Sequence, residues 1–203
     1  MFVLCDSDAT GSAPVGTCFA VSPRHVLTCF HNLRMADQTS TNDTYNIAEV
    51  VEKTNGVLSF SRGKRTVKVA RQNKKADWAI LKLVDVSTED LVPIPISAEP
   101  LSMDVDLKVF HCPVGIFNNC STEQVSVGTR WTKTFTPTEH HVKVDFGLFS
   151  GSSGAPFILR NGRVVAFHQE SFSQSEEILR LCPRQTSTRF QTPLTAPRPS
   201  THL

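Results

Sequence analysis

Short apolar runs with a period of two, separated by turn residues, recur along this 203-residue chain. Such alternation is typical of strands with one buried face, and about eleven runs of this kind can be counted. The candidate strands are 17–21, 25–29, 47–51, 66–70, 78–84, 107–110, 124–131, 141–146, 157–160, 163–168 and 177–181. The last of these fits a short helix equally well. The pattern predicts an all-β chain.

Two turn signals and one connector organise the candidate strands. Ser22-Pro23-Arg24 predicts a hairpin between the first two strands, and Asn161-Gly162 is a strong hairpin turn. A proline-rich segment at 91–95 interrupts the pattern near the middle of the chain. We therefore expect two six-stranded antiparallel β-barrels packed together, spanning 1–96 and 97–182. Residues 183–203 are rich in Pro, Ser, Thr and Arg without periodicity, which predicts a disordered tail.

The balance of charge and hydropathy disfavours several classes of partner. A net charge of +2, from 21 basic and 19 acidic residues, is too small to indicate nucleic acid or anionic lipid as the main partner. No apolar run approaches the roughly 18 residues of a membrane span. The basic segment 62–75 is expected to be a solvated hairpin with its approach loop, the alternative being a patch for an acidic partner. The first residues lack the features of a secretory signal, so we expect a cytoplasmic or otherwise intracellular protein, with secretion left open.

The cysteines and histidines do not form a metal-binding pattern. Six cysteines are present and none forms a CxxC pair, so a zinc ribbon is disfavoured and reduced, mostly buried thiols are expected. Cys18 and Cys29 lie on the two arms of the predicted hairpin, where a disulfide is the alternative. Four histidines outside the stretches described next lie on different predicted strands without ligand spacing. No metal and no other cofactor is predicted.

Three short stretches carry side chains suited to acyl transfer. His31 directly follows a predicted strand, Asp77 directly precedes one, and Ser153 lies in the small-residue turn 150–156. A serine hydroxyl is a poor nucleophile unless an imidazole takes its proton, and the imidazole needs a carboxylate to fix its tautomer. Glycines beside the serine allow a sharp turn whose N–H groups converge on one point, as an oxyanion requires.

These stretches resemble a known family. Gly16–Ser22 and Val26–His31 are similar to the first hairpin and Thr-Ala-Ala-His box of the trypsin-like (chymotrypsin-fold) serine proteases. Asp77–Leu83 resembles the Asp-Ile-Ala-Leu-Leu-Lys-Leu box, and Gly151–Pro156 resembles Gly-Asp-Ser-Gly-Gly-Pro. Val109–Gly115 looks like the first strand of the second barrel. The likeness is to a compact form of the glutamyl-endopeptidase, bacterial-type branch.

The resemblance implies a role for each matching residue. His31 would be the general base and then acid, Asp77 its orienting carboxylate, and Ser153 the nucleophile. The N–H groups of Gly151 and Ser153 would form the oxyanion hole, with Phe149 and Ser150 lining its approach. His25, six residues before His31 in the predicted hairpin, is the competing imidazole.

The resemblance also implies a role for one residue of the substrate pocket. His168 matches a histidine that helps bind an acidic substrate side chain in the glutamyl-endopeptidase branch, so a preference for Glu or Gln is one expectation. The alternative is a strand ending in histidine without such specificity. No aspartate stands where trypsin would bind Arg or Lys.

Two departures from the family's pattern concern the residues next to the triad. Ser152 replaces the acid used in proteolytic activation, which argues against a trypsin-type zymogen switch. Asn32 stands where a cysteine would close the disulfide of the histidine loop.

The resulting hypothesis is a serine endopeptidase acting on polypeptide through an acyl-enzyme, with no nucleic acid or membrane partner. The alternative is a catalytically silent trypsin-like domain that binds peptides or partner proteins. An esterase using the same three residues is a third possibility, because the chemistry is shared.

Overall fold

The structure is a computed structural model that describes residues 1–5, 14–36, 44–52, 58–85, 90–98, 105–112, 128–133, 141–144, 151–171 and 177–181. Within these ranges the chain forms twelve strands and one helix. They are β1 (Phe2–Cys5), β2 (Pro14–Ser22), β3 (His25–Thr28), α1 (Phe30–Ala36), β4 (Thr44–Glu52), β5 (Leu58–Asn73), β6 (Trp78–Leu83), β7 (Asp106–His111), β8 (Gly128–Lys133), β9 (His141–Val144), β10 (Pro156–Ile158), β11 (Val164–Ser171) and β12 (Glu177–Leu181).

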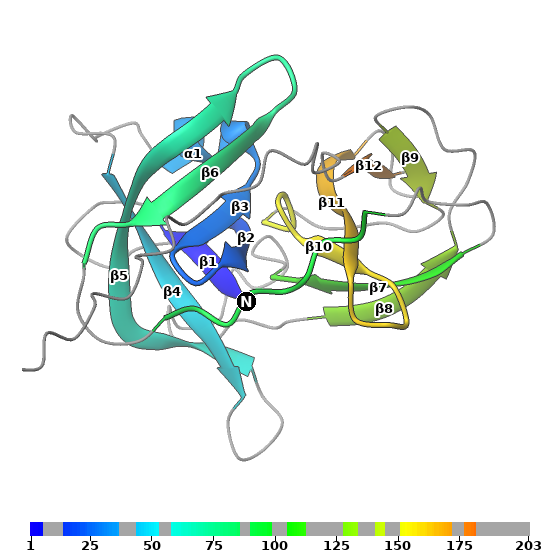
Figure 1. Cartoon of the computed structure of the whole chain (residues 1–203), viewed down its shortest axis with the longest axis horizontal. Coiled ribbons are helices and arrows are strands. Elements are labelled where there is room, and N and C mark those ends of the chain that lie inside the picture. The colour runs from blue at the N-terminus through cyan, green and yellow to red at the C-terminus, as the bar shows by residue number, and fades with distance from the viewer. Residues whose placement is uncertain are drawn as a thin grey trace, which may run out of the picture.

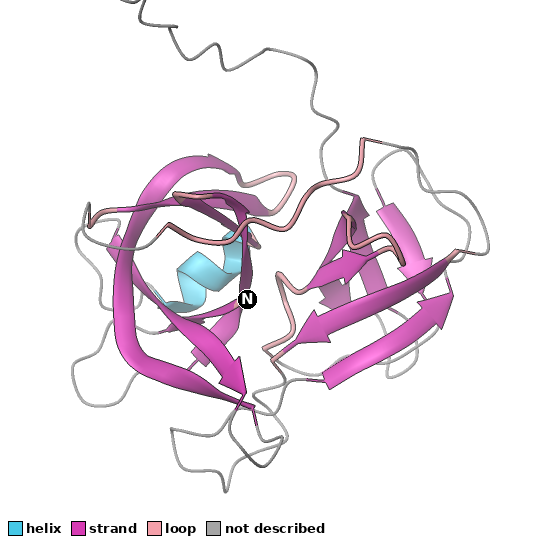
Figure 2. Ribbon diagram, turned by 60° about the horizontal axis from the view of Figure 1, so that its bottom comes forward, coloured by secondary structure: helices cyan, strands magenta, loops and turns pink. Residues whose placement is uncertain are grey.

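The first six strands close into a barrel in the order β1-β2-β3-β6-β5-β4, and β1 pairs with β4 to complete it. Alternate side chains of these strands point inward, as the period of two requires. Cys18 and Ala20 of β2 lie in the barrel core with Val26 of β3, and Leu33 of α1 packs against them. Figure 2 shows α1 lying across the ring of barrel strands.

The remaining strands form an antiparallel six-stranded sheet in the order β8-β7-β10-β11-β12-β9. Among the described residues, β8 and β9 are its edge strands. The barrel and this sheet lie side by side, with the connector passing between them (Figure 1). The connector bonds to both halves, since the N–H of Ile94 donates to Ala20 and the N–H of Ser97 donates to Val164.

A shared apolar cluster joins the two halves. Phe19 and Leu27 are cross-strand partners on the outer face of the barrel, where they pack with Phe167 and Val164 of β11. Phe19, Val164 and Phe167 are fully buried. Fully burying one such side chain stabilises the fold by roughly 1.5–3 kcal/mol. This contact brings the turn before β10 against the end of β3.

The expected all-β architecture with two packed six-stranded halves is confirmed. The first half is a closed barrel as predicted, whereas the strands described in the second half form a six-stranded sheet that is not closed. Both hairpin turns are present, and 177–181 is a strand rather than a helix. Two elements were not predicted. All four residues of β1 are buried, so no polar alternation marks it, and α1 is too short at seven residues for a helical period to emerge. The tail at 183–203 lies outside the described residues.

The basic segment 62–75 was expected to be a solvated hairpin with its approach loop. The hairpin is present, since β5 pairs antiparallel with β6 through the turn at 74–77. The approach loop is wrong, because residues 62–73 belong to the single 16-residue strand β5. Val67 is buried and Val69 partly buried, while Lys68 between them is exposed. Alternation therefore continues through the positive charges.

No helix among the described residues is both long and apolar enough to cross a membrane.

Four cysteines lie within the described residues, and all four are buried free thiols. They are Cys5, Cys18, Cys29 and Cys112. Cys18 and Cys29 are thus unpaired with each other, which agrees with the expectation of reduced thiols. Loss of solvation raises the pKa of Cys5 to about 11 and of Cys112 to about 12, and it also raises the pKa of Cys18 and of Cys29.

These raised pKa values predict a steep loss of stability in alkali. An unfolded thiol has a pKa of about 8.5, so above that pH the unfolded state releases protons that the folded state retains. The free energy of unfolding should fall by about 1.4 kcal/mol per pH unit for each thiol between about pH 9 and 11. Urea titrations at pH 8, 9 and 10 measure this slope. Cys112→Ala should reduce it by one thiol's share, and an unchanged slope in that variant would contradict the prediction.

Candidate active site

His31 and Asp77 are brought together by the register of β3 and β6. These strands are antiparallel with Thr28 opposite Ala79, so the residues after Thr28 and before Ala79 meet at one barrel edge. Nδ1 of His31 lies 2.7 Å from Oδ2 of Asp77, and the backbone N–H of His31 donates to Oδ1 at 2.8 Å. A carboxylate can only accept, so the His31 ring donates from Nδ1 and leaves a lone pair on Nε2.

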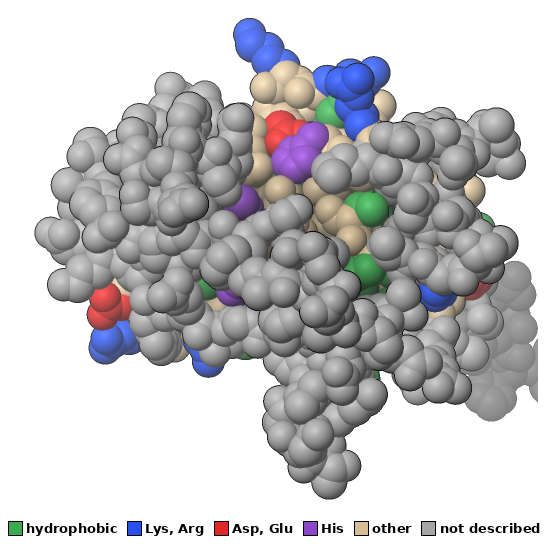
Figure 3. Space-filling model, turned by 180° about the vertical axis from the view of Figure 1, so that it is seen from behind, with side chains coloured by type: hydrophobic (Ala, Val, Ile, Leu, Met, Phe, Trp, Pro, Cys, Tyr) green, Lys and Arg blue, Asp and Glu red, His purple; other side chains and the backbone are tan. Residues whose placement is uncertain are grey.

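The conformation of Asp77 is set by the preceding turn. Its φ is +49°, in the left-handed region, where aspartate and asparagine are better tolerated than most residues. The N–H of Ala76 donates to Oδ1 of Asn73, which stabilises the turn. The side chains of His31 and Asp77 are 38% and 17% exposed. A histidine and an acidic side chain accordingly lie together at the surface in Figure 3.

His25, the competing imidazole, lies elsewhere. His25 lies on β3 opposite Lys82 of β6, and its Nδ1 lies 2.8 Å from Oγ of Ser22 at the β2–β3 turn. Burial, with smaller contributions from Lys82 and Arg24, lowers the pKa of His25. Of these two histidines, His31 is the one paired with a carboxylate.

The turn that carries Ser153 is anchored to the first barrel. The N–H and Oγ1 of Thr17 donate to the carbonyls of Ser153 and Gly151, each at 2.8 Å. Nδ2 of Asn32 donates to the same Ser153 carbonyl at 2.9 Å. Because Asn32 directly follows His31, this bond places the backbones of the imidazole and the predicted nucleophile next to each other. In the sequence, Asn32 stands out only as the residue replacing a cysteine, and Thr17 lies within a matching stretch; no role was predicted for either.

Positive φ values shape the same turn. Gly151 and Gly154 both have φ of +89°, which glycine adopts without strain. Among the described residues, neither the N–H of Gly151 nor that of Ser153 donates to a backbone carbonyl. These are the two N–H groups predicted to form an oxyanion hole. Ser152 is buried and Ser153 is partly exposed, so the second serine is the accessible one.

The hydroxyl of Ser153 is not bonded to His31 in this structure. Within the described part of the chain, no hydrogen bond joins Oγ of Ser153 to the imidazole. Such contacts are often long in free enzymes and shorten when substrate binds. The His31–Asp77 contact is therefore closed while the Ser153–His31 contact is open.

Of the three residues predicted to line the substrate site, the structure describes only His168. Phe149 and Ser150 lie outside the described residues. His168 is in β11 with only 2% of its surface exposed, and its carbonyl accepts the N–H of Gly154 and the thiol of Cys29. Its backbone thus supports the nucleophile turn. A contact between its imidazole and a substrate side chain stays a prediction.

One group of possible metal ligands occurs among the described residues. Cys29, His31 and Asp77 each offer an atom, and these atoms lie within 4.8 Å of one another. Burial and the nearby Asp77 carboxylate raise the pKa of Cys29 well above its usual value, so the thiol holds its proton. Nδ1 of His31 and the Asp77 carboxylate already satisfy each other. The group therefore fits a His–Asp pair over a buried thiol better than a metal centre.

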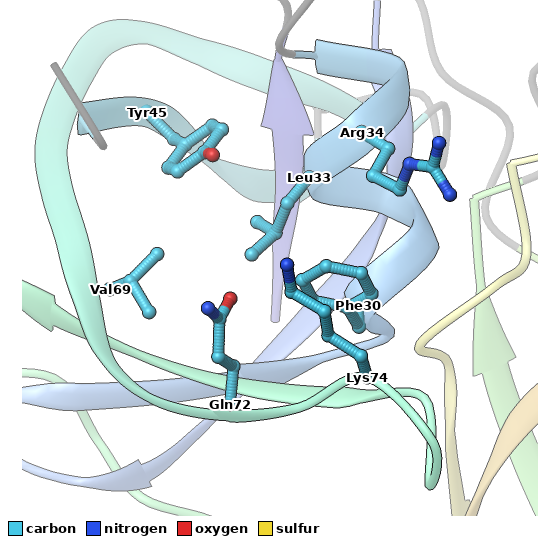
Figure 4. Close-up of a pocket in the computed structure, with 7 residues that line it drawn as sticks. All are labelled: Phe30, Leu33, Arg34, Tyr45, Val69, Gln72 and Lys74. Atoms are coloured by element: carbon cyan, nitrogen blue, oxygen red, sulfur yellow. The ribbon is translucent and has the colours of Figure 1, made fainter.

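A cavity of about 470 Å³ lies between α1 and β5 and contains none of the three candidate catalytic residues (Figure 4). Its lining residues are Phe30, Leu33, Arg34, Tyr45, Val69, Gln72 and Lys74. Nζ of Lys74 is 5.5 Å from the ring centroid of Phe30 at its rim. Because His31 and Asp77 do not line it, this cavity is separate from the candidate active site.

Comparisons with known proteins identify the family and the fold. A family model described as a trypsin-like peptidase domain matches residues 16–167. Among solved structures, the MamO protease domain from Magnetospirillum magneticum superposes with a TM-score of 0.61 at 13% identity, covering 89% of each chain. The serine protease of a human pathogenic astrovirus gives 0.57 at 16% identity over 90% of each chain. Identities this low establish the fold alone. No curated protein matches the chain.

Proposed function

The chain belongs to the trypsin-like peptidase family, and we propose that it acts as a serine endopeptidase through Ser153, His31 and Asp77. The observation that carries the proposal is the pairing of His31 with Asp77 through two hydrogen bonds, one from the ring and one from the backbone. The pairing leaves Nε2 as a proton acceptor, and the next residue, Asn32, bonds to the carbonyl of Ser153. Family membership implies polypeptide substrates.

The reaction divides into acylation and deacylation. Oγ of Ser153 attacks the scissile carbonyl while Nε2 of His31 takes its proton, and the N–H groups of Gly151 and Ser153 stabilise the resulting oxyanion. When the tetrahedral intermediate collapses, the C–N bond breaks and the leaving amine receives the proton from His31. Water then attacks the acyl-enzyme with His31 as base, releasing the acid and restoring Ser153. Asp77 stabilises the imidazolium formed in each half.

A fluorophosphonate probe tests this proposal directly. Wild-type protein should be labelled at Ser153, as mapped by mass spectrometry. Ser153→Ala should abolish labelling because the nucleophile is gone, and His31→Ala should slow it by about three orders of magnitude or more. His25→Ala is the matched control and should label at the wild-type rate.

The second candidate function is a catalytically silent domain that binds peptides or partner proteins. The open contact between Ser153 and His31 is the observation that favours it. Folded wild-type protein that resists labelling, or that labels equally well after His31→Ala, would support this second function over the first. Comparing turnover of an ester and of a peptide library would separate an esterase from an endopeptidase, and the library would also test the expected preference for Glu or Gln.

A further inference from the structure

A buried histidine outside the triad contacts the turn that carries Ser153. His111 ends β7 and is only 4% exposed, and its Nδ1 lies 2.8 Å from Oγ of the fully buried Ser152. Ser152 stands between Gly151 and Ser153, whose N–H groups are the proposed oxyanion hole. We propose that His111 is a positioning residue that holds these two N–H groups in place through Ser152. The inference rests on the proposed function, because the oxyanion hole matters only if Ser153 reacts.

The backbone connects the Ser152 side chain to the proposed oxyanion hole. The N–H of Ser153 belongs to the peptide group that begins at Ser152. A change in the ψ angle of Ser152 therefore redirects this N–H. The carbonyl of Ser152 already accepts the N–H of Ala155. A buried hydroxyl that loses its hydrogen-bond partner is destabilising, because water cannot replace the lost bond. The bond to His111 therefore keeps the Ser152 side chain, and with it the local backbone, in a single orientation.

The side chains that anchor the Ser153 turn come from both halves of the molecule. Thr17 and Asn32 bond to the carbonyls of Gly151 and Ser153 from the first barrel. His111 bonds to the residue between them from β7 of the second sheet. The neighbouring Cys112 reinforces this arrangement, since its N–H donates to Oγ1 of Thr17 at 3.3 Å. The turn is thus held between the two halves. The second half also bonds to Gly154 through the His168 carbonyl, but His111 supplies the side-chain anchor at Ser152 itself.

Saturation kinetics with a fluorophosphonate probe measure the proposed effect. In this reaction Oγ of Ser153 forms a bond to phosphorus, fluoride leaves, and His31 takes the proton. The phosphonyl oxygen occupies the oxyanion position. His111→Leu should lower the maximal phosphonylation rate about 10- to 100-fold, with the half-saturating probe concentration changed by less than about threefold. His111→Asn keeps a polar atom near the position of Nδ1 and should recover the rate to within about threefold of wild type.

Two further sets of variants separate positioning from general destabilisation. Ser152→Ala should slow phosphonylation about as much as His111→Leu, and the double variant should be no slower than either single one, because both remove the same bond. His25→Leu is the matched control. It removes another His–Ser hydrogen bond of 2.8 Å, at the β2–β3 turn, and should leave the phosphonylation rate unchanged.

A second readout does not depend on catalysis. The amide ¹H–¹⁵N resonances of Gly151 and Ser153 should shift in His111→Leu and stay at their wild-type positions in His25→Leu. Wild-type protein that is never labelled would refute the proposed function, while shifted resonances would still support the role of His111 in the turn. A folded His111→Leu variant with a wild-type phosphonylation rate and wild-type Gly151 and Ser153 resonances would overturn the proposal.

Discussion

Replacing Asp77 with asparagine should lower kcat about 10⁴-fold and leave the protein folded. Both oxygens of the Asp77 carboxylate accept hydrogen bonds from His31, one from the ring and one from the backbone. An asparagine that presents its NH₂ group to Nδ1 would force the proton onto Nε2. The ring could then no longer accept the proton of Ser153. Asparagine also tolerates the left-handed φ of +49° at this position, so the turn should survive.

The control for this substitution is Asp85→Asn. Asp85 is an exposed residue just beyond the opposite end of β6, so the variant makes the same change of charge away from His31. Its kcat should match that of the wild-type protein. Steady-state assays with a peptide substrate, together with thermal unfolding of both variants, give the comparison. A folded Asp77→Asn variant retaining kcat within tenfold of wild type would show that Asp77 does not orient the catalytic imidazole.

The strands that could be predicted from the sequence are those with one face in a core and one in solvent. β6 is the clearest case, since its inward residues Ala79, Leu81 and Leu83 alternate with more exposed ones. β1 could not be predicted because both of its faces are covered. Phe2 and Leu4 point into the barrel core, while Val3 and Cys5 pack with Ala48 and Cys112. A strand without a polar face has no alternation to detect.

The candidate site also contains residues that could be predicted from the sequence and residues that could not. His31, Asp77 and Ser153 could be chosen from the sequence because each lies in a stretch resembling a family box, and in the structure His31 and Asp77 are hydrogen-bonded to each other. The residues that hold the turn, Thr17 and His111, could not be chosen. They act through contacts that depend on how the two halves of the molecule pack rather than on local sequence.

Gly154→Ala should be strongly destabilising, because the turn has no space for an added methyl group. A Cβ at this position would lie 2.0 Å from the carbonyl oxygen of Thr17 and 2.9 Å from Oγ1 of Thr28. The φ of +89° adds backbone strain. Strain of this kind costs about 1–3 kcal/mol, and overpacking costs about 1–3 kcal/mol more. Against a total stability of about 5–15 kcal/mol, we expect a loss of about 4 kcal/mol in urea unfolding.

Gly162→Ala isolates the contribution of the backbone. Gly162 has a similar φ of +82°, yet nothing lies within 4 Å of its added Cβ. It should therefore lose about 1–2 kcal/mol from strain alone. The difference in the free energy of unfolding between the two variants measures the clash with Thr17. The N–H of Thr17 also donates to the Ser153 carbonyl. Relief of that clash must move the strand or the turn, so Gly154→Ala should also lose labelling of Ser153 while Gly162→Ala keeps it. Equal losses of stability in the two variants would mean that the turn does not press against the first barrel as described.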